Sequence, residues 1–125
     1  MTTLSAVTGG SGFVGSHLVE RLRAEGHEVV ALARSAAARR ALEGLGAVVV
    51  AGDLDDDGAL ARLCGDAEQV FHVAGVLAAR SGAEFLRVNR DGAARAAAAA
   101  RAAGARRLVL VSSLSVTGPT RPGRP

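Results

Sequence analysis

The sequence contains no lysine, no tyrosine and no tryptophan, and its 125 residues include one cysteine and three prolines. The single cysteine, Cys64, excludes an internal disulfide and is typical of a protein from a reducing cytoplasm. Cys64 follows Leu60 and Leu63 on an expected helix, so we expect a small buried side chain and not a reactive thiol. All the prolines lie between residues 118 and 125, which we expect to form a loop.

Long hydrophobic runs and clustered charge are also lacking. No uninterrupted apolar run is long enough to span a membrane, and the N-terminus lacks the basic and then apolar pattern of a secretory signal. The basic residues are all arginines, the net charge is +3, and the arginines are scattered instead of grouped with aromatic residues. We therefore predict a cytoplasmic protein with no membrane partner, no nucleic-acid partner and no metal site.

One glycine-rich stretch organises the chain, and it reads Thr8-Gly9-Gly10-Ser11-Gly12-Phe13-Val14-Gly15. An apolar run precedes it at residues 4–7, and an amphipathic run follows at residues 13–25. Strand, glycine turn and helix in this order form the phosphate-binding start of a dinucleotide fold. Glycines there permit a tight turn, a close pyrophosphate and close helix packing, and the helix dipole faces the phosphates. The alternative is a structural turn with no ligand.

Two registers fit this stretch. Gly10, Gly12 and Gly15 spell G-x-G-x-x-G, the general dinucleotide pattern. Thr8, Gly9, Gly12 and Gly15 instead spell T-G-x-x-G-x-x-G. Both registers share Gly12 and Gly15, and the residues alone leave the choice open.

Five apolar runs alternate with helical patterns along the chain. The expected strands cover residues 4–8, 28–33, 47–51, 69–74 and 108–112, and the expected helices cover residues 13–25, 36–45, about 53–64 and 83–103. This alternation predicts an α/β fold, a Rossmann-type doubly wound parallel sheet with five strands in the order 3-2-1-4-5. We expect one domain over residues 1–125. Residues 108–111 are apolar on both faces, like an interior strand, so the sheet is expected to be incomplete at its C-terminal side.

Two finer predictions concern the helices. Along residues 13–25, Val14, Leu18 and Leu22 line one apolar stripe, with Val19 beside them. Along residues 83–103, oppositely charged residues are spaced for two i,i+4 ion pairs, Arg87 with Asp91 and Asp91 with Arg95.

Charged residues follow the second and third strands, at the edge where such sheets bind ligands. The second strand ends in Ala33 and Arg34, without the acid that NAD-preferring folds use for the ribose 2′-hydroxyl. A guanidinium at this place binds a 2′-phosphate, so the sequence favours NADP over NAD, and the alternative is a merely exposed arginine. After the third strand, Asp53 and Leu54 are candidates for adenine contact. Helix capping is the alternative for Asp53, and we assign the cap to residues 55–57.

The fourth strand ends in Phe71-His72-Val73-Ala74-Gly75, beside the same crevice. Small residues at Val73, Ala74 and Gly75 would let a cofactor lie against the backbone. His72 invites a catalytic interpretation, but the alternation of side chains along the strand predicts a packed histidine.

Five motifs occur in the order and spacing of a known family. They are Thr8-Gly9-x-x-Gly12-x-x-Gly15, Gly52-Asp53-Leu54, His72-Val73-Ala74-Gly75, Val88-Asn89-Arg90-Asp91-Gly92 and Leu110-Val111-Ser112-Ser113. From residue 4 to about 124 the chain resembles the extended short-chain dehydrogenase/reductases, the NAD(P)-dependent epimerase/dehydratase group that includes dihydroflavonol-reductase-like and hydroxysteroid-dehydrogenase-like members. The resemblance implies an enzyme that moves a hydride between a nicotinamide cofactor and a hydroxyl or carbonyl substrate, such as a sugar nucleotide.

The resemblance also implies site residues. Ser113 lies where the family has a catalytic serine or threonine that hydrogen-bonds the substrate oxygen, and Asn89 matches a helix asparagine next to the active site. The cofactor would contact the residues at the ends of the first four strands, namely Gly9, Gly12, Phe13, Val14, Gly15, Arg34, Asp53, Leu54, Val73, Ala74 and Gly75. A homodimer of the full-length protein, paired through helices including residues 83–103, is a further implication.

The family's acid, a tyrosine in a Tyr-x-x-x-Lys motif beyond the serine, does not occur in this sequence. We therefore expect a truncated N-terminal part, an NAD(P)-binding domain without its C-terminal substrate-binding part, that is inactive alone. Two alternatives remain, a non-catalytic NAD(P)H-binding sensor module and the inactive product of a truncated gene.

Overall fold

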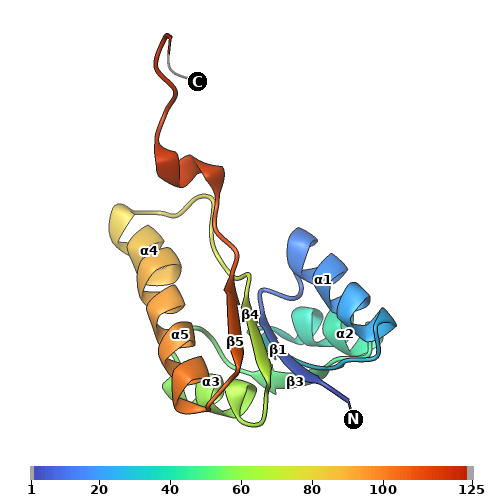
Figure 1. Cartoon of the computed structure of the whole chain (residues 1–125). Coiled ribbons are helices and arrows are strands. Elements are labelled where there is room, and N and C mark those ends of the chain that lie inside the picture. The colour runs from blue at the N-terminus through green and yellow to red at the C-terminus, as the bar shows by residue number, and fades with distance from the viewer. Residues whose placement is uncertain (1, 124–125) are drawn as a thin grey trace.

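The structure is a computed structural model that describes residues 2–123. Five parallel strands form one sheet in the order β3-β2-β1-β4-β5 (Figure 1), which confirms the predicted fold class and strand order. The strands are β1 Leu4–Thr8, β2 Glu28–Ala33, β3 Val48–Ala51, β4 Gln69–His72 and β5 Arg107–Leu110. The helical elements are α1 Phe13–Ala24, α2 Ala36–Gly44, α3 Asp57–Cys64, α4 Gly82–Leu86, the π-helical turn η1 Arg87–Asp91, α5 Gly92–Ala102 and the 3-10 turn η2 Leu114–Thr117.

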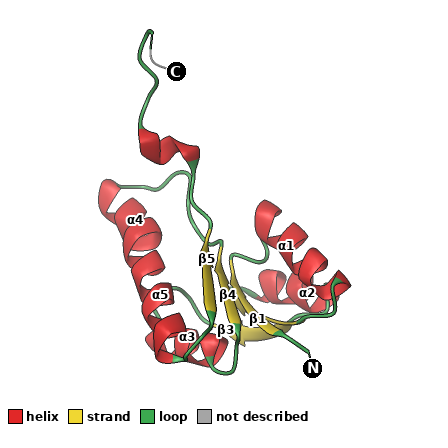
Figure 2. Ribbon diagram, viewed as in Figure 1, coloured by secondary structure: helices red, strands yellow, loops and turns green. Residues whose placement is uncertain are grey.

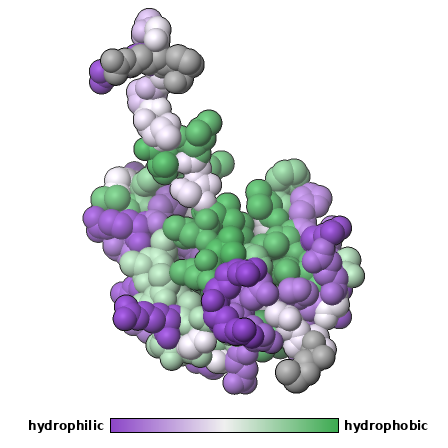
Figure 3. All heavy atoms as spheres, viewed as in Figure 1, coloured by the Kyte–Doolittle hydropathy of each residue, from purple (hydrophilic) through white to green (hydrophobic). Residues whose placement is uncertain are grey.

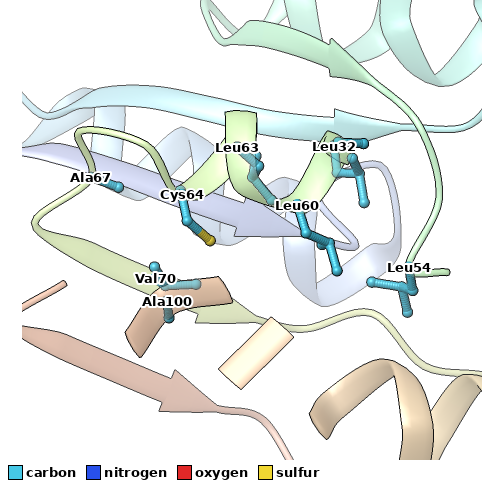
Figure 4. Close-up of a cluster of buried hydrophobic side chains, with 10 residues drawn as sticks. Leu32, Leu54, Leu60, Leu63, Cys64, Ala67, Val70 and Ala100 are labelled. Atoms are coloured by element: carbon cyan, nitrogen blue, oxygen red, sulfur yellow. The ribbon is translucent and has the colours of Figure 1, made fainter. Parts of the chain in front are cut away.

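Helices cover both faces of the sheet, with α1 and α2 on one face and α3 and α5 on the other (Figure 2). The core beneath α1 and α2 contains Val19, Leu22 and Leu42. The core beneath α3 and α5 contains Leu60 and Cys64 among its buried side chains (Figure 4). Burial raises the pKa of the Cys64 thiol, so Cys64 is the small apolar core residue that its position predicts.

The buried face of α1 differs from the predicted stripe by one position. Gly15, Val19 and Leu22 are buried, whereas Val14 is 54% exposed and Leu18 is half-buried. The predicted apolar face is therefore confirmed at Val19 and Leu22 and wrong at Val14, whose place is taken by Gly15. The reason is the close approach of Gly15 to the preceding turn, which directs the Gly15 face of the helix toward the sheet.

The predicted helix over residues 83–103 contains a π-helical turn, η1, between α4 and α5. The two predicted i,i+4 ion pairs within it do not form. Arg87 and Arg95 instead contact Asp55 and Asp57, at the start of α3. The π turn changes the spacing along the helix, since the Gly92 N–H donates to the Arg87 carbonyl, five residues back.

Strand β5 lies at an edge of the sheet, and residues 111–123 run away from it (Figure 1). Apolar surface covers the β5 region and continues over η2 (Figure 3), with Leu110 55% and Leu114 86% exposed. Residues 118–123 form a loop apart from an isolated bridge residue at Arg121, and the rest of the predicted C-terminal loop, residues 124–125, lies outside the described residues. Within residues 2–123, no helix has the length and apolar character needed to cross a bilayer.

Candidate functional site

A cavity of about 640 Å³ opens at the carboxyl ends of the strands. Its volume falls in the range of small-molecule sites, and its position is the one at which doubly wound sheets bind ligands. The structure brings all the predicted cofactor residues to its wall, namely Gly9, Gly12, Phe13, Val14, Gly15, Arg34, Asp53, Leu54, Val73, Ala74 and Gly75.

Three of the four glycines in the first turn are required by the fold itself. Gly9 has a φ of +70°, and a Cβ there would lie 2.5 Å from the backbone nitrogen of Ala74. A Cβ on Gly15 would collide with the carbonyl oxygen of Gly9. Gly10 does not line the cavity, and a Cβ there would lie 2.9 Å from the side chain of Leu42 on α2. Gly10 is therefore a packing residue against the core.

Gly12 differs because the protein leaves room for a side chain there. Its φ is −78°, and a Cβ would meet only the carbonyl oxygen of Gly9, at an ordinary 3.5 Å. Gly12 lines the cavity and precedes the first residue of α1. Of the glycines in this turn, Gly9, Gly12 and Gly15 thus face the cavity, which is the T-G-x-x-G-x-x-G register, and the protein leaves the space above Gly12 open.

The N-terminus of α1 points its N–H groups into this space without a side-chain cap. Helices α2, α3 and α4 are capped by Ser35, Asp56 and Ser81, respectively. No side chain within residues 2–123 caps α1, and its first turn holds no acidic residue. Unpaired N–H groups and the positive end of the helix dipole suit a bound anion.

Two charged side chains from the described part of the chain line the cavity, Arg34 after β2 and Asp53 after β3. Arg34 is exposed and Asp53 is half-buried. Asp53 Oδ1 accepts a hydrogen bond from the Leu54 N–H at 2.7 Å. The cap of α3 is Asp56, whose Oδ1 accepts from the Ala59 N–H at 2.9 Å, so the capping alternative for Asp53 is wrong.

Thr8 holds the cavity wall that follows β4. Its Oγ1 accepts hydrogen bonds from the N–H groups of Val73 and Ala74, both at 3.2 Å, and lies 2.7 Å from His72 Nδ1. The Val73 N–H is shared with the Thr8 carbonyl, also at 3.2 Å. Because both N–H groups are directed at the hydroxyl oxygen, we assign the hydroxyl proton to the bond with His72 Nδ1 and the imidazole's own proton to Nε2. Burial lowers the pKa of His72, which is 2% exposed. His72 is the packed histidine that was predicted.

The two predicted catalytic residues do not line the cavity. Asn89 lies in η1, where its Oδ1 accepts from the Val76 N–H and its Nδ2 donates to the Val76 carbonyl, both at 2.9 Å. Its polar atoms therefore hold the loop after β4. Ser113 caps η2 and accepts from the Ser115 N–H at 3.2 Å. The cavity residue nearest to it in sequence is Val111.

Sequence reasoning missed several residues of the wall. They are Ser11, Leu32, Ser35, Ala38, Val76, Leu77, Val88 and Val111, together with Ala33, which the sequence analysis names only as a position without an acidic residue. Most adjoin a predicted residue at a strand end, and that adjacency is the signal that could have identified them. Val88 does not adjoin a strand end, and the signal for it was its place beside Asn89 in the motif Val88-Asn89-Arg90-Asp91-Gly92.

A parallel doubly wound sheet with a glycine turn, an uncapped helix and a cavity at its switch point defines a Rossmann-type dinucleotide-binding domain. The pattern of the NAD dependent epimerase/dehydratase family matches residues 5–125. The chain belongs to this family, which confirms the resemblance to the extended short-chain dehydrogenase/reductases.

Three known proteins illustrate the relationship. A ceramide reductase of Caulobacter vibrioides is 47% identical over 115 residues, which cover 92% of this chain and 36% of that protein. A 4-hydroxy-2-methyl-3-oxo-4-farnesyl-3,4-dihydroquinoline-1-oxide ketoreductase of Stigmatella aurantiaca is 39% identical, over 93% of this chain and 35% of that protein. A short-chain dehydrogenase/reductase superfamily protein from Agrobacterium tumefaciens, solved with bound NAD, is 32% identical with a TM-score of 0.78, over 94% of this chain and 35% of that one.

The chain thus spans about a third of the length of these relatives. The relatives support NAD(P) binding and membership in a family of oxidoreductases and epimerases. Because these relatives are enzymes by name, they do not favour the sensor alternative.

Proposed function

We propose that this chain is the dinucleotide-binding domain of an NADP(H)-dependent oxidoreductase or epimerase/dehydratase. The observation that carries the proposal is Gly12, a glycine that the fold does not need and whose missing side chain keeps open the space before the uncapped N-terminus of α1. A pyrophosphate is an anion that fits that space.

Each end of the cavity has its own role in the proposal. Gly9, Gly12 and Gly15 lie against the pyrophosphate. Arg34 binds the 2′-phosphate in a charge-assisted fork, since Ala33 before it carries no competing carboxylate. Asp53 accepts a hydrogen bond from the adenine amino group with a carboxylate oxygen.

Small and apolar residues line the end of the cavity that the proposal gives to the nicotinamide. They are Val73, Ala74 and Gly75 after β4, together with Val88 and Val111 from later in the chain. When bound, the nicotinamide accepts or donates a hydride. These side chains exclude water from the ring and offer no group that competes for the substrate. Ser113 would hydrogen-bond the substrate oxygen, and η2 would have to approach the cavity for it to do so.

The substrate in this proposal carries a hydroxyl or carbonyl group. A sugar nucleotide fits the epimerase/dehydratase family, and the ceramide reductase relative adds an amphiphilic lipid as a candidate. Because the sequence holds neither tyrosine nor lysine, we propose that residues 1–125 are one domain that binds cofactor without turnover. From the family resemblance we also propose that the full-length protein is a homodimer.

The test is titration of NADPH and NADH by calorimetry against the parent chain, Arg34→Ala and Gly12→Val. One charge-assisted contact contributes about 1.5–3 kcal/mol, so NADPH is expected to bind roughly ten- to a hundredfold more tightly than NADH. Arg34→Ala should remove that preference, and Gly12→Val should abolish binding of both while circular dichroism is unchanged.

Two controls match these variants. Arg40→Ala removes an exposed arginine of α2 that does not line the cavity, and Gly44→Val fills open space on the same helix. Both should bind as the parent does. Equal affinities of the parent for NADPH and NADH would refute the cofactor preference, and undiminished binding by Gly12→Val would refute the site.

A further inference from the structure

The segment Asp53–Asp57 begins at the part of the cavity wall that the proposed function gives to the adenine, and it then leads into α3. Asp53 and Leu54 line the cavity, whereas Asp55, Asp56 and Asp57 are exposed. A backbone hydrogen bond from the Asp56 N–H to the Asp53 carbonyl, 3.1 Å, closes the turn between the two parts. The place of the Asp53 carboxylate therefore depends on how this short segment is held.

A helix far along the chain holds it. Arg95 Nη1 donates to Asp57 Oδ1 at 2.7 Å and reaches the Asp55 carbonyl at 3.5 Å. Arg87 Nη1 lies 3.4 Å from Asp55 Oδ2. Two arginines of one helix thus contact the segment on both sides of its cap residue.

Between the two arginines, Gly92 lets the helix backbone touch the wall itself. A Cβ on Gly92 would lie 2.8 Å from Cδ1 of Leu54, which is 7% exposed and lines the cavity. Gly92 is buried, so this contact is part of the packed interior and is not a surface approach.

The π turn is what aligns these three residues. In an unbroken α-helix the residue one turn beyond Arg87 is Asp91, four positions on. In η1 the turn closes five residues on, with the Gly92 N–H bonded to the Arg87 carbonyl. Gly92 then lies below Arg87, and Arg95, three positions further, lies on the same face. π turns of this kind are frequent at functional sites.

We propose that Arg87, Gly92 and Arg95 are positioning residues that fix the adenine wall for the cofactor, an inference that rests on the proposed function. Both ion pairs are exposed, so they add little to global stability. Their effect is to restrict the motion of the segment Asp53–Asp57. A segment that is already ordered loses less conformational entropy when the ligand binds.

The experiment measures the affinity of the chain for adenosine 2′,5′-bisphosphate, a probe of the adenine end alone. Arg87→Gln and Arg95→Gln should each weaken binding about two- to fivefold, and the double variant should weaken it more. The melting temperature of each variant should fall no further than that of the control Arg21→Gln, which breaks the exposed Arg21–Glu25 pair of α1. Arg95→Lys should restore most of the affinity, and 1 M salt should shrink the difference between parent and variants.

Hydrogen exchange distinguishes a local effect on residues 53–57 from a general loss of stability. In the double variant, exchange in residues 53–57 should accelerate while residues 9–15 keep the parent's protection. Parent-like affinity of the double variant overturns the inference and leaves the proposed function standing. Loss of affinity together with a fall in melting temperature and no rescue by Arg95→Lys also overturns it. If the parent chain binds neither the probe nor NADPH, both proposals fail.

Discussion

Replacing Thr8 by valine tests the hydrogen-bond network under the cavity wall. Valine has nearly the shape of threonine and suits a β-strand equally well, so the change removes one hydroxyl and creates no cavity. That hydroxyl has three partners in the structure, His72 Nδ1 and the N–H groups of Val73 and Ala74.

The magnitude follows from what each partner loses. His72 is 2% exposed, so its Nδ1 becomes a buried acceptor without a donor, at a cost of about 1–3 kcal/mol. The Val73 N–H keeps its second acceptor, the Thr8 carbonyl at 3.2 Å. Ala74 is half-buried, so water replaces part of what its N–H loses. We expect Thr8→Val to lower the free energy of unfolding by about 2–4 kcal/mol. Because domains of this size are stable by about 5–15 kcal/mol, the variant should still fold.

Urea unfolding followed by circular dichroism measures this, since the chain has no tryptophan or tyrosine for fluorescence. Thr8→Ser keeps the hydroxyl and loses one methyl group, and should cost only about 1 kcal/mol. Adding His72→Phe to Thr8→Val removes the unpaired acceptor, Nδ1, and should recover part of the lost free energy of unfolding. A Thr8→Val variant within about 0.5 kcal/mol of the parent would refute the network and the histidine tautomer derived from it.

Two further outcomes are expected. The pKa of His72 is lower in the folded chain than its ordinary 6.5 because of burial, so the unfolded chain takes up the proton first. The stability held by neutral His72 is therefore complete above about pH 6.5 and is lost as the pH falls below it, and urea midpoints between pH 7 and 5 should fall less steeply in His72→Phe. Gly15→Ala should destabilise the chain by about 1–3 kcal/mol, because its Cβ collides with the Gly9 carbonyl. A melting temperature equal to the parent's would contradict that collision.

The sequence by itself determined the fold and most of the residues that line the cavity. Strand and helix periods are local, and right-handed crossovers between parallel strands leave few possible orders for five alternating elements. Residues that end parallel strands gather at one edge of the sheet, so the sequence alone assigns Gly12, Arg34, Asp53 and Ala74 to one cavity.

The tertiary structure alone decided the features that depend on a partner from another element. Gly10 is a packing residue because Leu42 of α2 lies against it, and no local pattern contains that contact. The oxygen of Thr8 joins a histidine 64 residues away. Arg87 looks like half of an i,i+4 pair, yet it contacts Asp55 instead. The spacing that permits this comes from a π turn, and a helix adopts such a turn where packing against its neighbours compensates the poorer backbone geometry.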